Sequence, residues 1–166
     1  PGSIAQDVVD EELHSHYDWM PTLLDYLNLE NPEASLLPGR SFASLLRGEK
    51  SDGHGRVVVF DEYGPVRMIR DKEWKYIHRI PYGPHELYHL SHDPEERNNL
   101  IDDPSLSDKV AEMKSGLFDF FATYADPQRD GAHEAVYGRG QIERVGPKGA
   151  GRKAFQDVPV ARLGKE

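Results

Sequence analysis

The sequence predicts an α+β fold, a small four-stranded antiparallel sheet packed against a long C-terminal helix. Two observations predict it. Short segments rich in β-branched and aromatic residues follow one another between residues 57 and 90, separated by turn-forming residues. One long segment with helical periodicity then runs from about residue 104 to residue 125. One or two helices precede the sheet, and an irregular glycine-rich arm follows the long helix.

The first helix is expected within residues 13–29. Apolar residues recur there at intervals of three and four, on one helical face: Leu13, Tyr17, Met20, Leu24 and Leu27. Because Pro21 is tolerated only in the first turn, the regular helix should begin close to Asp18. A second short helix is predicted over residues 41–47, where Gly48 supplies the stop signal.

The sheet is predicted from four segments, 57–63, 66–70, 74–80 and 86–90. The connections between them are short, which favours hairpins between successive strands. In the third segment Trp74, Tyr76 and His78 alternate with Lys75 and Ile77, so one face of the strand can be buried.

The long helix is the clearest element. Asp103 is a suitable cap, with Pro104 at the first helical position. An apolar stripe follows over five turns: Leu106, Val110, Met113, Leu117, Phe120 or Phe121, and Tyr124. Six glycines then lie between residues 131 and 151 without a sustained period, which predicts an arm that is mobile or laid over another surface. The predicted parts are therefore 1–55, 56–126 and 127–166.

Composition narrows the functional classes. The chain has 20 Lys and Arg against 29 Asp and Glu, and a net charge of −9 disfavours nucleic acid as a partner. No apolar run approaches the roughly 18 to 20 residues that cross a bilayer, so no membrane association is predicted. With no cysteine, disulfides and thiolate sites are excluded, and the compartment stays undetermined. The first three residues resemble a protease remnant, so we expect the natural N-terminus to be missing.

Motifs that carry chemistry are scarce. His85, His89 and His92 lie close together, but no further ligand is fixed beside them, so no metal site is predicted. The chain has no G-x-S-x-G nucleophile elbow and no glycine-rich phosphate loop that feeds a helix. The acidic run 93–96 can be a cation-binding loop, but it is more typical of a turn. No catalytic residue is assigned.

Three stretches in this order resemble the C-terminal region of sulfatases in the alkaline phosphatase superfamily. They are residues 18–27 with Pro38-Gly39-Arg40-Ser41, the strand pair 66–70 and 74–77, and residues 86–100, which read E-L-Y-H-L…D-P-E-E-R-N-N-L. The resemblance covers residues 13 to about 125. One departure is His89, where the family usually has Asp.

The resemblance implies a parent sulfuric ester hydrolase in which this chain is a non-catalytic fragment. Sulfatases use calcium and a formylglycine made from Cys or Ser in [CS]-x-P-x-R. Two P-x-R sites, 38–40 and 127–129, have Leu36 and Ala125 at that position, so neither can form it. The chain therefore needs no cofactor of its own, and calcium and formylglycine are implied for an absent N-terminal sulfatase domain, its expected partner.

The same resemblance implies that this region edges the substrate cleft. Asp61, Glu62, Tyr63 and Arg67, between the first two predicted strands, are the candidates for the rim. Paired charges with an aromatic ring suit a sulfated small molecule or sugar. An ordinary solvated hairpin is the alternative.

Two other functions stay open. The chain can be an independent binding or oligomerisation module, self-associating through the first helix or the arm. It can also be the C-terminal part of a phosphonate or phosphate monoester hydrolase. An independent module should cover the helix that carries Leu13, Met20 and Leu24, whereas a severed subdomain should leave an apolar patch exposed.

Overall fold

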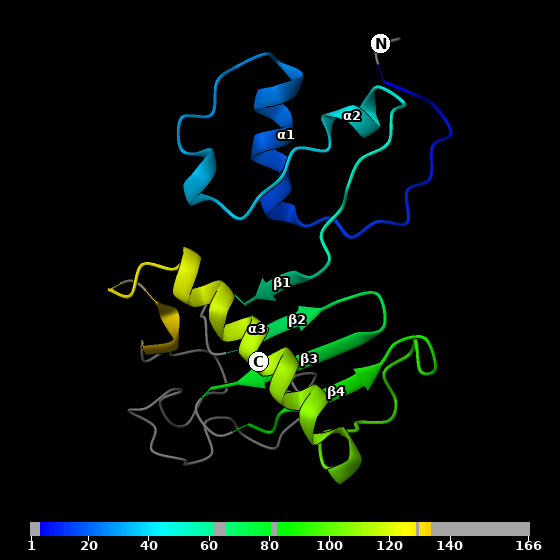
Figure 1. Ribbon diagram of the computed structural model, residues 1–166, viewed down its shortest axis with the longest axis vertical. Helices are drawn as coiled ribbons and strands as arrows, with labels where there is room; N and C mark the ends of the chain where they lie inside the picture. The colour runs from blue at the N-terminus through cyan, green and yellow to red at the C-terminus, as the bar shows by residue number, and fades with distance from the viewer. Residues whose placement is uncertain (1–3, 62–65, 81–82, 129, 134–166) are drawn as a thin grey trace, which may run out of the picture.

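The structure is a computed structural model that describes residues 4–61, 66–80, 83–128 and 130–133. Two units follow one another along the chain (Figure 1). The first is helical and N-terminal, and the second contains the sheet and the long helix. The chain passes once between them, through the segment that precedes the first strand.

The N-terminal unit contains two α-helices and two short 3₁₀ helices. These are η1 (His16–Asp18), α1 (Trp19–Tyr26), η2 (Ala34–Leu36) and α2 (Ala43–Leu46). As the position of Pro21 predicted, the regular helix begins next to Asp18. Leu13 lies before it and forms an isolated bridge with His54. Of the predicted apolar face, Leu13, Tyr17 and Leu24 are half-buried, whereas Met20 and Leu27 are exposed.

The sheet has four antiparallel strands in the order β1-β2-β3-β4. Their bounds are β1 (Val57–Phe60), β2 (Val66–Arg70), β3 (Trp74–Arg79) and β4 (Glu86–His89). The register aligns Val58 with Ile69, Ile69 with Tyr76, and Tyr76 with Leu87. Because paired residues point to the same face, these four side chains form one buried row across the sheet.

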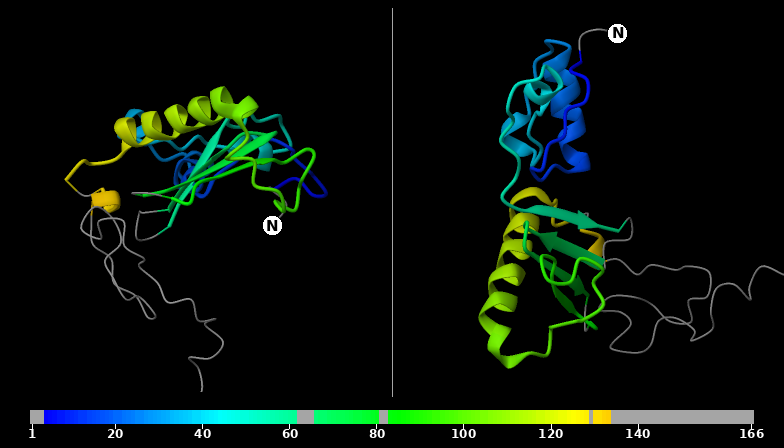
Figure 2. Two further views of the ribbon diagram at one scale, coloured as in Figure 1. Left: turned by 90° about the horizontal axis from the view of Figure 1, so that it is seen from below. Right: turned by 90° about the vertical axis from the view of Figure 1, so that its right-hand side faces the viewer.

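Helix α3 (Ser107–Tyr124) covers this row, and η3 (Pro104–Leu106) leads into it. Figure 2 shows α3 lying across one face of the sheet. Met113 and Leu117 are the buried residues of the helix and complete the core. The predicted cap is present, since the Asp103 carboxylate accepts a hydrogen bond from the Ser105 amide at 2.9 Å. The α+β prediction is confirmed.

After α3 the chain turns back toward the sheet and forms η4 (Gly131–His133). Ala132 in this element is buried. Residues 130–132 of the predicted arm are therefore packed, whereas Pro127 and Gln128 are exposed, and the arm from residue 134 lies outside the described residues. Over the described residues, no helix combines the length and the apolar character needed to cross a lipid bilayer.

A stacked pair of histidines, of which His78 is buried, lies beneath α3. His78 on β3 is 6% exposed, and its Nδ1 lies 2.8 Å from the Tyr76 hydroxyl. Its ring stacks on that of His85, with 4.2 Å between ring centroids. Burial lowers the pKa of His78 to about 4, and the charges of His85, Lys114 and Arg67 add to this effect. The fold therefore holds His78 in its neutral form.

This burial predicts a loss of stability in acid. The folded-state pKa of His78 lies below the unfolded value of 6.5, so stability is complete above pH 6.5 and falls toward pH 4. The loss should be on the order of 3 kcal/mol, since one pKa unit corresponds to about 1.4 kcal/mol. Urea unfolding at several pH values should show H78Q losing much less stability in this range than the parent chain. H16Q, a change at an exposed histidine, serves as the control. Equal losses in H78Q and the parent chain would show that His78 is not the titrating group.

Candidate functional site

The predicted substrate rim lies where β1 turns into β2. Asp61 closes this end of the hairpin, because its amide donates to the Val66 carbonyl at 3.1 Å and its carboxylate accepts from the Val66 amide at 3.4 Å. Glu62 and Tyr63 lie outside the described residues. The base of the turn is thus fixed by two contacts between Asp61 and the first residue of β2.

Arg67, the fourth rim candidate, points into the protein. Its side chain is 5% exposed and forms an ion pair with Asp130. Its guanidinium lies 3.6 Å from the centroid of the Phe121 ring, a cation–π contact. A buried guanidinium that is paired and stacked holds its surroundings in place. Arg67 therefore ties β2 to α3 and to Asp130, which follows that helix.

Sequence reasoning missed Asp130 as a partner of Arg67. The two residues are 63 positions apart, and Asp130 lies where the composition predicted only an irregular arm. No local pattern of spacing marks such a pair. The packed segment 130–133 is what brings the carboxylate to the sheet.

A fully buried carboxylate, that of Asp18, organises the N-terminal unit. It accepts hydrogen bonds from the amides of Ser15 at 2.7 Å and Arg40 at 2.9 Å. Nε2 of His54 lies 2.8 Å from the same carboxylate oxygen that Arg40 contacts. Burying an ionised carboxyl is costly unless it is well paired, so these three contacts define where each segment must lie.

Thr22 extends this network by one turn of α1. Its hydroxyl donates to the Asp18 carbonyl at 2.7 Å and accepts from the Phe42 amide at 3.0 Å. Gly39 sits close beneath, since a Cβ atom there would lie 2.1 Å from the Tyr17 carbonyl oxygen. The Asp and Thr of the D-x-x-P-T motif and the Gly of the P-G-R-S motif therefore act together, as the contact between two segments.

The acidic run after β4 forms a turn. The Asp93 carboxylate accepts from the Asn98 amide at 2.8 Å, and the Asn99 side-chain oxygen accepts from the amides of Leu87 at 2.9 Å and Ile101 at 3.1 Å. Glu96 instead contacts Lys75 on β3 at 2.5 Å. Asn99 and Glu96 thus tie the turn to the sheet, and Asp93 holds the turn itself together.

The three neighbouring histidines do not converge. His89 and His92 stack on each other with 4.1 Å between centroids, while His85 stacks on His78. The part of the chain that the structure describes contains no group of three or more His, Asp or Glu side chains placed to hold a metal ion. The side chains of the motifs described above thus make structural contacts within the chain.

Comparison with known proteins relates this chain to the C-terminal region of sulfatases. Residues 1–122 match the family model of N-sulphoglucosamine sulphohydrolase, C-terminal. The chain is 36% identical over 119 residues to a Delta 4,5-hexuronate-2-O-sulfatase of Bacteroides thetaiotaomicron, and the aligned region covers 68% of this chain and 24% of that protein. The chain thus spans about a quarter of the length of this curated relative.

Among solved structures, similar ones include a sulfatase and a phosphonate hydrolase. A 2-O GAG sulfatase has a TM-score of 0.58 and 30% identity, over 89% of this chain and 32% of the other. The phosphonate monoester hydrolase of Agrobacterium radiobacter has a TM-score of 0.55 and 24% identity, over 68% of this chain and 26% of the other. At that lower identity the second likeness concerns the fold alone.

The Asp18 network predicts a specific sensitivity. D18N keeps the size of the side chain but turns one acceptor into a donor that faces a backbone amide or His54. We expect the free energy of unfolding to fall by roughly 2 to 4 kcal/mol. Unfolding of the N-terminal unit can be followed by the emission of Trp19 in a W74F background.

The matched control is D25N on the same helix. Asp25 is largely exposed, and its carboxylate contacts Ser41 and Arg47 at the surface. Removing its charge should cost less than about 1 kcal/mol. Equal effects of D18N and D25N would contradict the role assigned to Asp18.

Proposed function

This chain belongs to the N-sulphoglucosamine sulphohydrolase C-terminal family, and we propose that it is the non-catalytic C-terminal part of a sulfatase. In that enzyme it would support the fold and edge the substrate cleft. The observation that carries the proposal is the unequal surface of α1. One side is anchored by buried hydrogen bonds, and the other presents bare apolar side chains.

The exposed side of α1 is large for a protein that stands alone. Trp19 is 61% exposed, Met20 47%, Leu23 44% and Leu27 55%. Contiguous apolar surface of this kind marks a contact with another protein surface. An independent module would be expected to cover it, whereas a subdomain continuous with a larger enzyme would leave it for the rest of that enzyme. The exposure therefore favours the second interpretation.

The bond-breaking chemistry is assigned to the part of the enzyme that this chain does not match. With no cysteine, and with Leu36, Tyr63 and Ala125 two residues before the proline of its P-x-R sequences, the chain cannot supply a formylglycine nucleophile. We assign formylglycine and calcium, the cofactors that the family resemblance implies, to the N-terminal sulfatase domain. That domain is the partner proposed for the exposed side of α1.

The proposed substrate is a sulfated sugar. The similar protein of Bacteroides thetaiotaomicron is named for a hexuronate 2-O-sulfate, which supports this class. Asp61, Glu62 and Tyr63 are the proposed contacts at the rim. Arg67 is proposed to position them, because it is buried against Phe121 and paired with Asp130.

The proposed organisation keeps three parts. Residues 1–55 continue the N-terminal sulfatase domain and end in a linker, residues 56–126 are the sheet-and-helix subdomain, and residues 127–166 are an arm. The exposed side of α1, or the arm, can also bind a second copy of the chain. A phosphonate or phosphate monoester hydrolase is the enzymatic alternative, supported by a likeness of fold.

An activity assay tests the proposal. The purified chain should hydrolyse an aryl sulfate only at background rate, because no residue in it can become the nucleophile. A longer protein that includes the proposed N-terminal domain should hydrolyse sulfate esters faster than aryl phosphonates.

Two results would overturn this assignment. Sulfatase turnover by the chain alone that survives repurification would place the catalytic residues within it. A longer protein that prefers phosphonates would support the alternative hydrolase.

A further inference from the structure

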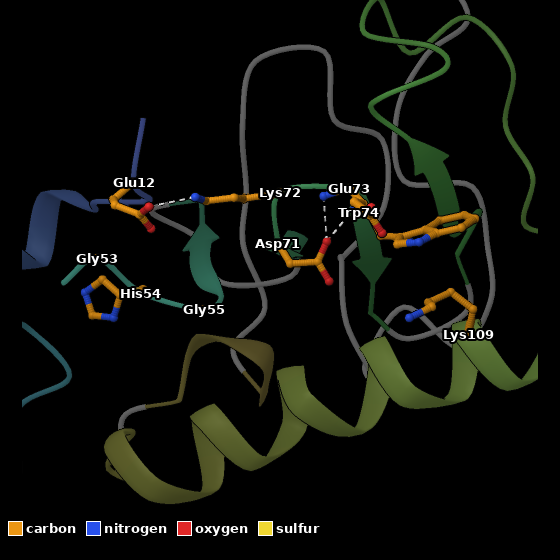
Figure 3. Close-up of a pocket in the computed structure, with 9 residues that line it drawn as sticks. All are labelled: Glu12, Gly53, His54, Gly55, Asp71, Lys72, Glu73, Trp74 and Lys109. Carbon is orange, nitrogen blue, oxygen red and sulfur yellow. Dashed lines mark hydrogen bonds and ion pairs between the residues drawn. The ribbon is translucent and has the colours of Figure 1, made fainter. Parts of the chain in front are cut away.

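A groove of about 310 Å³ lies between the N-terminal unit and the sheet (Figure 3). Four segments line it. The N-terminal segment contributes Glu12, the linker before β1 contributes residues 53–55 with His54, the β2–β3 turn contributes residues 71–74, and α3 contributes Lys109. The volume is at the lower end of the range for small-molecule sites. None of these residues belongs to the proposed rim.

The β2–β3 turn holds its part of the groove in a fixed shape. The Asp71 carboxylate accepts hydrogen bonds from the amides of Glu73 at 2.9 Å and Trp74 at 2.6 Å. The Asp71 amide donates to the Trp74 carbonyl at 3.0 Å. The Trp74 ring is partly buried against the core and lies 4.3 Å from the His89 ring, centroid to centroid. The groove thus has an indole whose position is set before any ligand arrives.

Both signs of charge line the groove. Nζ of Lys72 lies 2.8 Å from the Glu12 carboxylate, and Nζ of Lys109 lies 2.6 Å from the Glu112 carboxylate and 5.8 Å from the centroid of the Trp74 ring. Figure 3 shows the two lysines at different ends of the groove, with Lys72 reaching toward Glu12 and Lys109 beside Trp74. Exposed ion pairs are weak, so a ligand can exchange with these contacts at little cost.

This lining selects one class of ligand. An apolar molecule would bury the charged groups without partners, and a polyanion would meet the carboxylates of Glu12, Asp71 and Glu73. A saccharide has an apolar ring face that can pack on an indole and hydroxyl groups that donate to carboxylates. An anionic substituent would pair with Lys72 or Lys109.

The geometry points to a binding site for one saccharide unit that carries a sulfate or a carboxylate, with its ring at Trp74 and its anionic group at Lys72 or Lys109. The inference rests on the proposed function only for the expectation that the enzyme meets such sugars. The site binds and does no chemistry of its own.

Fluorescence tests the inference on the chain itself. The chain has two tryptophans, so W19F leaves Trp74 as the only indole. Glucose 6-sulfate and glucuronate should change the Trp74 emission saturably, with glucose about tenfold weaker, or about 1.4 kcal/mol. The anionic sugar that binds with the higher affinity shows whether the site prefers a sulfate or a carboxylate. Inorganic sulfate should leave the emission unchanged.

Charge variants separate the groove from the general surface. K72Q combined with K109Q should reduce the affinity for glucose 6-sulfate to that of glucose. The matched control is K114Q, which alters another α3 lysine near an aromatic ring, Phe118 at 5.9 Å, and should bind as the parent does. Circular dichroism of each variant confirms that it is folded.

Three results would overturn the inference. They are no saturable change with either anionic sugar, an equal response to inorganic sulfate, or unchanged binding in the double variant. Each is independent of the hydrolysis assay, because the titration needs no catalytic domain. A failed titration would leave the sulfatase assignment unaffected. A failed hydrolysis assay would likewise leave the binding site unaffected.

Discussion

The carboxylate of Asp18 has no contact with water, and the arrangement of the N-terminal unit depends on how it is satisfied. An unpaired charge in that position would cost several kcal/mol, so hydrogen-bond donors must be brought to it. They come from its own turn, from the backbone at Arg40 and from His54, which is 36 residues away. The start of α1, the segment before α2 and the linker into β1 are thereby fixed relative to one another. With one side of α1 held inward in this way, Trp19, Met20 and Leu23 are left on the outside.

The same logic explains why the sulfatase motifs are recognisable in a chain that has no assigned catalytic residue. Asp18 and Thr22 join α1 to the segment around Arg40, and Asn99 joins the turn after β4 to the sheet. Each of these side chains satisfies backbone groups that an apolar residue of similar size would leave without a partner. The chemistry of the proposed enzyme can therefore lie elsewhere while this region supplies shape.

Local patterns in the sequence predicted most of the fold. Turn residues at short spacing predicted all four strands, though β1 ends at Phe60, earlier than expected, and the apolar stripe predicted α3 together with its Asp103 cap. Long-range pairings could not be predicted, because nothing in the spacing of residues links Arg67 to Asp130 or Asp18 to His54. The rim candidates were chosen by their position in the sequence alone, which gives no direction for a side chain. The Arg67 side chain points inward because it contacts Phe121 on α3 and Asp130 just before η4. Its direction therefore depends on how these two elements pack on the sheet.

The proposed function makes the exposed side of α1 a contact surface for the rest of a sulfatase. Hydroxyl-radical footprinting read by mass spectrometry tests it directly, because Trp19 and Met20 are reactive side chains whose labelling depends on exposure. Both should label strongly in the isolated chain and become protected in the longer protein with the N-terminal sulfatase domain. Phe118, exposed on α3, is the internal reference and should label equally in both. Equal labelling of Trp19 and Met20 in the two proteins would contradict the account.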